Sequence, residues 1–293
     1  MAPGRSRGPR FGLGREGARA LLIAAVSTTV VFGVLGVVVV NAPGWSRFQQ
    51  SYLNGPIFWE SLSKVVPKFW VNVQLFLIAE VLILGLGLLL AMLRSLPGPV
   101  FFPVRLLATI YVDLFRALPG ILVIFLLGFG IPALRIEGVP KDEFTWAVVA
   151  LTLVYSAYVS EVYRSGIDSV HPSQLAAARS LGLSQVQALR YVIVPQAIRR
   201  VIPPLLNDFI GLQKDTVLVS FVGVVEIFRE TQILQSARFN FTPYVATALV
   251  FIVVTIPMAR FTDWLIGRER ARRGSGGMTV RAGTGRRGIG GVL

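Results

Sequence analysis

Residues 69–93 read FWVNVQLFLIAEVLILGLGLLLAML, and Glu80 is the only charged side chain among them. A helix needs about 20 consecutive apolar residues to cross the hydrocarbon core of a bilayer, and this stretch is long enough to do so. It therefore predicts a transmembrane helix and places the chain among membrane proteins.

The composition of the whole chain agrees with that placement. Of its 293 residues, 54% are hydrophobic and 15% are charged, whereas a soluble domain carries roughly 25% charged residues. Five further apolar stretches reach membrane length, at residues 20–40, 118–134, 144–163, 201–227 and 243–266. We therefore predict an all-α membrane protein with about six transmembrane helices.

Several classes of function are disfavoured by what the chain lacks. It has no cysteine, and His171 is its only histidine, so thiolate catalysis, disulfides and Cys- or His-rich metal sites are not expected. It also lacks the Gly-x-x-x-x-Gly-Lys-Ser/Thr loop that binds ATP phosphates. We expect no catalytic residue, no metal and no cofactor in this chain, and a membrane-embedded enzyme is disfavoured.

The net charge of +14 comes from Arg and Lys gathered at both termini and between the apolar stretches. This distribution is typical of loops at an anionic membrane surface and not of a nucleic-acid-binding face. If both termini lie in the cytoplasm, the cytoplasmic segments carry about three times as many Arg and Lys residues as the outside segments. We predict a basic cytoplasmic N-terminus over 1–19 and a basic, disordered C-terminal tail over 267–293.

The first apolar stretch needs a separate test, because Arg-rich residues precede it and residues 40–42 resemble a signal-peptidase site. A signal peptide has an apolar region of about 7–15 residues, which is shorter than this one. We favour a retained helix, and cleavage would leave five spans. Residues 41–68 are expected to form an extracytoplasmic loop with an amphipathic piece near Phe58 and Trp59.

Residues 166–200, between the fourth and fifth stretches, hold two helical patterns separated by Gly182. Ser173 is a plausible N-cap for the first helix. Leu175, Ala178 and Leu181 fall on one face of that helix. Gly182 suits a left-handed C-terminal residue. Ser184 can cap the second helix, which Pro195 is expected to end. The segment predicts a helix–turn–helix on the cytoplasmic surface, either inert or a docking site.

This segment resembles the EAA loop of ABC importer permeases. That motif reads Glu-Ala-Ala, three residues, Gly, nine residues, then an aliphatic residue, any residue, an aliphatic residue and Pro. The chain has the same spacing from Ala176–Ala178 through Gly182 to Val192, Val194 and Pro195. It departs from the motif at Ala176, which replaces the Glu, and at Ser173, where Gly is usual.

Other elements, in the same order along the chain, are similar to the polar amino-acid (His/Glu/Gln/Arg/opine) permeases. They are Asp113–Pro119, Tyr155–Tyr158 followed by Glu161 and Arg164, Pro195–Ala197, and Gln213–Thr216. The resemblance covers residues 69–266 and implies a five-helix permease core. The N-terminal stretch 20–40 and the basic tail are additions to that core.

The resemblance implies a transport subunit that alternates access to a solute path. Its implied partners are ABC ATPase subunits, a second permease that is the same or homologous, an extracytoplasmic solute-binding protein and a polar amino acid. It also implies a cell-membrane location and a coupling helix over 173–183. Contact with the ATPase is expected from Gln174, Ala177, Ala178, Gly182 and Leu183.

Charged residues inside apolar spans are costly, and each is by default a functional candidate. Glu161 and Arg164 lie three apart on one helix face, where they either pair with each other or meet a zwitterionic substrate. The fifth stretch holds a similar set around Asn207, Lys214 and Asp215. With Tyr158, these form the predicted substrate path.

Two alternatives stay open at this point. Besides the amino-acid permease, these are an ABC permease for another small solute and an ion-coupled secondary carrier. Carriers usually show internal repeats, and none is found in the sequence. The basic character favours an acidic substrate weakly, through Arg164 and Lys214. Four glycines are expected to allow close helix approach, namely Gly85, Gly87, Gly128 and Gly130.

Overall fold

A computed structural model of the chain describes residues 15–275, with side chains placed from 17 to 268. The predicted basic N-terminus therefore lies almost wholly outside the described residues, as does the tail beyond 275. The tail prediction is wrong at its start, because helix α12 (Thr242–Ser275) continues past residue 266.

Two compact units make up the chain, residues 1–54 and 55–293. The first holds helix α1 (Arg15–Val40) and the short helix α2 (Trp45–Tyr52). Residues 17–40 of α1 are apolar enough and long enough to cross a bilayer. The side chains of α1 are exposed along nearly its whole described length, which suits a helix whose surroundings are lipid.

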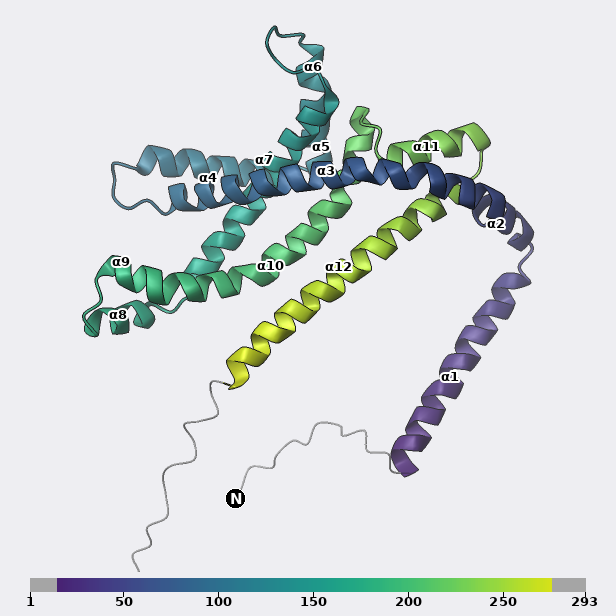
Figure 1. The fold of residues 1–293 in the computed structure, drawn as a ribbon, viewed down its shortest axis with the longest axis horizontal. Coiled ribbons are helices and arrows are strands. Elements are labelled where there is room, and N and C mark those ends of the chain that lie inside the picture. Colours follow the sequence, from purple (N-terminus) through teal and green to yellow (C-terminus); the bar gives the residue numbers. More distant parts are fainter. Residues whose placement is uncertain (1–14, 276–293) are drawn as a thin grey trace, which may run out of the picture. The chain divides into compact units, whose positions relative to one another are not determined.

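The second unit is built from helices and connecting turns, and no strand occurs in the described part of the chain (Figure 1). The elements that follow α2 are α3 (Gly55–Arg94), α4 (Phe102–Ala117), α5 (Gly120–Phe125), the π-helical η1 (Leu126–Gly130), α6 (Ile131–Ala133), α7 (Glu143–Asp168), α8 (Pro172–Ser180), α9 (Gln185–Ala188), the π-helical η2 (Leu189–Ile193), α10 (Val194–Asp215), the 3-10 helix η3 (Thr216–Val222), α11 (Ile227–Arg238) and α12. The predicted all-α class is confirmed.

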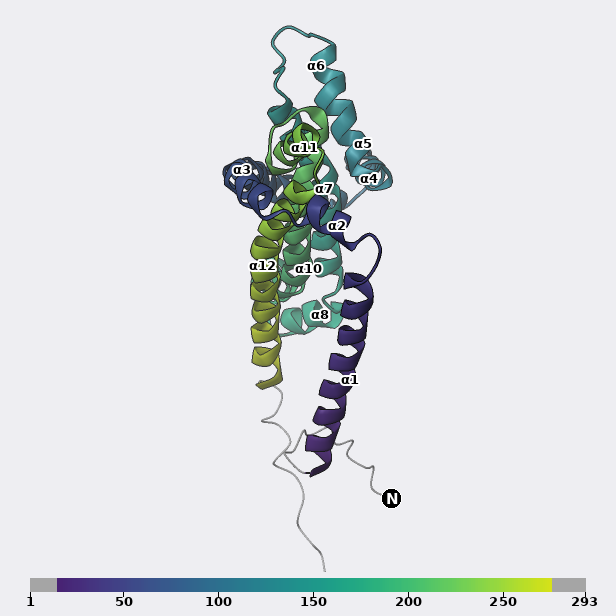
Figure 2. The same ribbon diagram turned by 90° about the vertical axis from the view of Figure 1, so that its right-hand side faces the viewer.

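Helix α7 is the centre of this unit and packs against α3, α4, α5 and α10 (Figure 2). Asp142 caps its N-terminus by accepting a hydrogen bond from the Thr145 amide at 2.8 Å. Its apolar residues meet those of α3 and α10 in one core cluster that includes Leu75, Leu151 and Leu212. The close approach of these helices forms the frame on which the candidate site is built.

The predicted outer loop over 41–68 is mostly helical. Helix α2 occupies residues 45–52, and α3 begins at Gly55, fourteen residues before the predicted start of the second span at 69. Phe58 and Trp59 therefore lie on the long helix α3 and not in a separate amphipathic piece. Pro67 does not stop α3, whose backbone stays helical across it.

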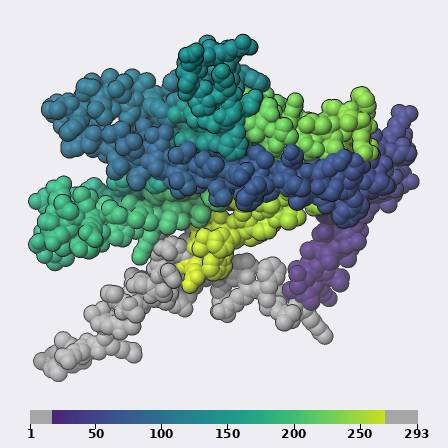
Figure 3. Space-filling model, turned by 45° about the horizontal axis from the view of Figure 1, so that its top comes forward, coloured from purple at the N-terminus to yellow at the C-terminus, as the bar shows by residue number. Residues whose placement is uncertain are grey.

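The predicted third span, 118–134, corresponds to α5, η1 and α6, and a sharp bend at its start separates it from α4. Leu118 precedes Pro119 and adopts an extended backbone (φ −81°, ψ 136°), as residues before proline usually do. Helix α4 ends there, and the chain turns by 104° into the segment 120–133. That segment stands out from the side of α3 (Figure 3). The 16 residues of α4 were not predicted as a helix.

The predicted fifth span, 201–227, is not one helix. Helix α10 ends at Asp215, η3 follows, and Gly223 takes a left-handed φ of 102° before α11 begins. In residues 15–275, four helical stretches are long and apolar enough to cross a bilayer, or five if the bent pair counts as one span. Six spans were predicted. The one that is not among these stretches is 201–227, because α10 carries too many charged residues to be apolar over a membrane length.

The start of α11 is fixed by a buried carboxylate. Glu226 is fully buried and accepts hydrogen bonds from the amides of Phe228 and Arg229 at 3.0 and 2.8 Å. Asn72 of α3 donates to the same carboxylate at 2.8 Å and to Thr216 at 3.0 Å. These bonds join α3, η3 and α11 at one point.

Candidate functional site

A cavity of about 290 Å³ lies between α7, α10 and the start of α5. Its polar lining comes from two tyrosines of α7 and two aspartates of α10, and no Lys or Arg is among its lining residues. The residues that line it are Gly120, Ile124, Ala150, Leu151, Val154, Tyr155, Tyr158, Asp208, Asp215 and Leu218. The volume suits a small solute, and the only formal charges on its wall are negative.

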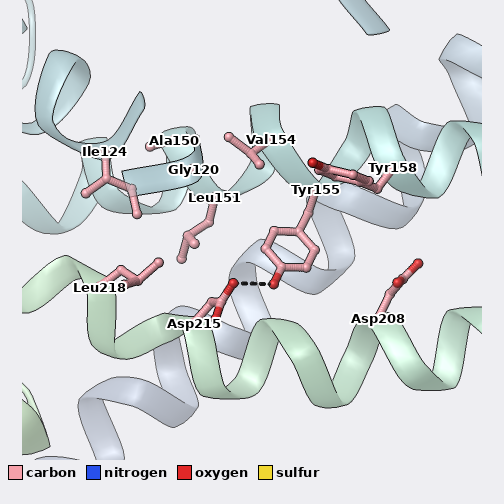
Figure 4. A pocket seen from close by; sticks show the side chains of 10 residues that line it. All are labelled: Gly120, Ile124, Ala150, Leu151, Val154, Tyr155, Tyr158, Asp208, Asp215 and Leu218. Atoms are coloured by element: carbon pink, nitrogen blue, oxygen red, sulfur yellow. Dashed lines mark hydrogen bonds between the residues drawn. The ribbon is translucent and has the colours of Figure 1, made fainter. Parts of the chain in front are cut away.

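The two aspartates differ in their partners (Figure 4). Asp215 accepts a hydrogen bond of 2.7 Å from the Tyr155 hydroxyl. Asp208 lies seven residues earlier, two turns away on the same side of α10, and its Oδ2 is buried without a hydrogen-bond partner. A buried, unpartnered carboxylate oxygen is costly in the empty protein, and a cationic donor entering the cavity would satisfy it.

Glu161, which we expected to pair with Arg164 or to meet substrate, pairs instead with two arginines from other helices. Arg94 at the end of α3 bonds its carboxylate directly, and Arg116 of α4 lies 3.7 Å away. The predicted Glu161–Arg164 ion pair is not among the described contacts. Arg164 lies close enough to act on Glu161 only through its charge. Tyr158, which lines the cavity, lies beneath the Arg116 guanidinium at 6.0 Å.

The remaining predicted path residues divide between the cavity and the surface. Asp215 lines the cavity, while Asn207 and Lys214 are exposed on other sides of α10. Gln213 accepts a hydrogen bond from Thr255 of α12 at 3.2 Å. Arg164 and Lys214 are not in the cavity lining, so the idea that they bind an acidic substrate there loses its support.

The hairpin of α8 and α9 projects beyond α7 and α10 (Figure 3). Its first cap is His171 and not Ser173, because Pro172 occupies the first helical position and keeps the preceding residue extended. His171 Nδ1 accepts from the Ser173 amide at 3.2 Å. The predicted Ser184 cap is confirmed, and with Gln187 it forms a capping box.

The turn of the hairpin has the predicted left-handed glycine, Gly182, with φ at 85°. The Leu183 amide donates to Ala178 O and the Gly182 amide to Arg179 O, which is the bonding pattern of a Schellman motif. Pro195 does not end the second helix. The π-helical turn η2 precedes it and lets the backbone continue into α10.

The five predicted docking residues are not equally accessible. Gln174, Ala177 and Gly182 are exposed, and Leu183 is half-buried. Ala178 is only 4% exposed and packs inward, so it does not fit a docking role. Leu181, predicted to share a helix face with Ala178, is 84% exposed and lies next to Gly182 in the turn.

The predicted substrate path lacked two of the four polar residues of the cavity, Asp208 and Tyr155. Tyr155 entered the sequence analysis only as part of a resembling element. The available signal was spacing, since residues 208 and 215 are seven apart and so share a helix face. The pairing of Tyr155 with Asp215 joins two helices and has no local signature in the sequence.

Several helices of membrane length, with a small cavity between α7 and α10 and a projecting hairpin, are the features of a multi-pass membrane protein. No group of three or more His, Cys, Asp or Glu that could hold a metal occurs among the described residues.

The chain belongs to the family described as the binding-protein-dependent transport system inner membrane component, whose model matches residues 83–271. It is therefore a permease subunit of an ABC transporter and not itself an enzyme. Permeases of this family work with an ATPase, a partner permease and a solute-binding protein.

Two relatives illustrate the similarity. The chain is 34% identical to a probable glutamine ABC transporter permease of Bacillus subtilis over 214 residues, which are 73% of this chain and 96% of the relative. It is 34% identical to the glutamate transport system permease of Corynebacterium efficiens over 212 residues, 68% of this chain and 92% of the relative. They confirm the family suggested by the sequence elements.

Solved structures agree. A crystal structure of an amino acid ABC transporter with histidines has a TM-score of 0.62 at 32% identity, covering 73% of this chain and 94% of that chain. An inward-facing MetNI methionine ABC transporter has a TM-score of 0.58 at 15% identity, covering 74% of this chain and 99% of its own. The latter likeness concerns the fold alone.

Proposed function

We propose that the chain is the permease of an ATP-driven importer for amino acids and that the cavity between α7 and α10 is a station on its solute path. The relatives are named as a probable glutamine permease and a glutamate permease, and the solved relative is an amino acid ABC transporter. Every amino acid carries an α-ammonium group, and the cavity offers two carboxylates to such a group.

The observation that carries this proposal is the unpartnered Oδ2 of Asp208. Asp215 is already held by Tyr155. An ammonium between the two aspartates would donate a charge-assisted hydrogen bond to Asp208 Oδ2 without breaking that contact. Tyr158 then flanks the solute. Glu161 and its two partners, Arg94 and Arg116, lie outside the cavity lining.

The hairpin 172–195 is the docking element for the ATPase in this proposal. Gln174, Ala177, Gly182 and Leu183 are the predicted contacts that remain accessible, and Leu181 joins them because of its exposure. With this surface in the cytoplasm, both termini are cytoplasmic and the 41–54 segment faces outward. The second permease is either an identical or a homologous chain.

The test is ATP-driven uptake in proteoliposomes that contain the chain, its ATPase and its binding protein. A hydrogen bond to a charged group contributes about 1.5–3 kcal/mol, so Asp208→Asn should lower uptake about 10- to 100-fold. Asn207→Ala is the matched control, because Asn207 is the exposed neighbour outside the cavity.

Uptake that survives Asp208→Asn unchanged, with normal insertion, would remove the cavity from the solute path. A panel of competing solutes separates the two open substrate classes. Competition by amino acids supports the proposal, whereas competition only by solutes without an ammonium group would point to the alternative permease.

A further inference from the structure

The N-terminal unit ends in a feature that the permease function does not use, the junction of α1 and α2. No charged residue occurs between Arg19 and Arg47. The 24 residues from Gly17 to Val40 extend about 36 Å at 1.5 Å per residue, which exceeds the hydrocarbon core of about 30 Å. The end of α1 at Val40 is therefore at a surface of the bilayer.

The turn after α1 is too tight to carry the chain away from that surface. The Asn41 side chain donates to Val37 O at 2.7 Å. The backbone then makes two further bonds, from Ala42 to Val39 O at 3.2 Å and from Trp45 to Ala42 O at 3.0 Å. Helix α2 begins at Trp45, so only four residues separate it from the end of the span.

Helix α2 has one aromatic side. Trp45 stacks on Phe48 with centroids 5.5 Å apart, and Phe48 stacks on Tyr52 at 4.9 Å. At 100° per residue, Ser46, Arg47 and Gln50 fall on the other side. No residue of α2 is buried, so its aromatic side is not part of a protein core.

The aromatic side faces back toward the span. An apolar cavity of about 250 Å³ is lined by Val39, Ala42 and Gly44 together with Trp45 and Phe48. Val39 belongs to the last turn of α1, which is surrounded by lipid if α1 spans. The same lipid therefore meets the aromatic side of α2, while Arg47 falls on the opposite side of the helix.

We propose that α2 is an interfacial helix that binds the bilayer, with the upper acyl chains and glycerol region covering Trp45, Phe48 and Tyr52. Trp and Tyr are enriched at this depth, and short amphipathic helices lie there with their charged residues toward the headgroups. The Arg47 guanidinium is then within reach of lipid phosphates. Such a helix fixes how deeply α1 sits in the membrane.

The absence of cysteine from the chain allows a direct test by single-cysteine spin labelling. Full-length chain carrying Ser46→Cys, Arg47→Cys or Phe48→Cys is reconstituted in phosphatidylcholine–phosphatidylglycerol liposomes. Val31→Cys within α1 is the lipid reference. Relaxation by oxygen, which partitions into lipid, is compared with relaxation by a water-soluble nickel chelate.

The oxygen-to-nickel ratio at position 48 should exceed that at 47 several-fold and stay below that at 31. Gln49→Cys repeats the measurement beside the aromatic side with all three rings kept. Equal nickel access at 46, 47 and 48 would put α2 in water and overturn the proposal. A label at 48 shielded from both reagents would show that protein, and not lipid, covers the aromatic side.

Discussion

Glu161 joins three helices through one carboxylate. Arg94 of α3 bonds it, and Arg116 of α4 approaches to 3.7 Å. The Arg94 side chain is 7% exposed and its Nε has no hydrogen-bond partner, so its charge depends on Glu161 for compensation. Removal of the carboxylate therefore leaves a buried cation alone.

Glu161→Gln should lower the stability of the protein. Breaking a fully buried ion pair costs about 3–5 kcal/mol, and since Glu161 is partly exposed we expect about 1–3 kcal/mol. Thermal unfolding of the purified chain in detergent measures the loss as a lower Tm.

Glu60→Gln is the comparison for that experiment. Glu60 pairs with Lys64 and Arg238, both of which are largely exposed. Water screens exposed ion pairs and they contribute little to stability, so this variant should unfold near the temperature of the parent. Equal losses in the two variants would mean that the burial of Arg94 does not decide the effect.

Helix packing around α7 depends on particular glycines. A Cβ at Gly87 would lie 2.7 Å from Val159 Cγ1, and one at Gly128 would lie 2.8 Å from Val222. Gly85 and Gly130 have nothing within 4 Å. The expectation of close helix approach at these four glycines is therefore right for two of them and wrong for the other two.

Gly87→Ala should destabilise the α3–α7 contact by about 1–3 kcal/mol, the usual range for overpacking. Gly85→Ala lies on the same helix in open space and gains helix propensity of up to about 1 kcal/mol. The two variants should move the Tm of unfolding in opposite directions, or leave Gly85→Ala unchanged. A lower Tm for both would contradict the packing assigned to Gly87.

The hairpin gives a second prediction at this scale. Leu181 is exposed at the tip, so Leu181→Asp should leave the fold intact and weaken capture of the ATPase subunit. Gln185→Asp, on the exposed start of α9, is the control. Pull-down from membranes reports the difference, and equal capture by both variants would argue against docking at the tip.

The hairpin also shows what the sequence can predict. Gly182 and Ser184 were predicted correctly, because a left-handed glycine and an N-cap act within a few residues. The effect of Pro195 was not, since η2 absorbs the missing amide without ending the helix. The partners of Glu161 lie on α3 and α4, far away in the chain, and no local pattern encodes them.

At the scale of the whole molecule, the proposed orientation can be tested with two cysteine variants. In right-side-out vesicles, a membrane-impermeant maleimide should label Ser46→Cys and should reach Gln185→Cys only after permeabilisation. The cysteine-free parent provides the blank. The reverse pattern would invert the proposed topology and place the hairpin outside.

The apolar runs predicted most of the membrane helices, because continuous hydrophobicity over about 20 residues has few other outcomes. The run 201–227 misled, because its apolar residues continue past the end of the helix. Helix α10 ends at Asp215, and the backbone then tightens into η3 over Thr216–Val222.

The 40 residues of α3 form one unbroken helix of about 60 Å, twice the thickness of the hydrocarbon core. Near one end Glu60 pairs with Arg238, and at the other Arg94 pairs with Glu161. A rigid helix of this length converts a small rotation at one end into a large displacement of the other end. If it pivots about one end by about 5°, the far end sweeps about 5 Å, close to the 5.4 Å pitch of one helical turn. If Glu161 stays in place, such a displacement of the Arg94 end is enough to separate the Arg94–Glu161 ion pair.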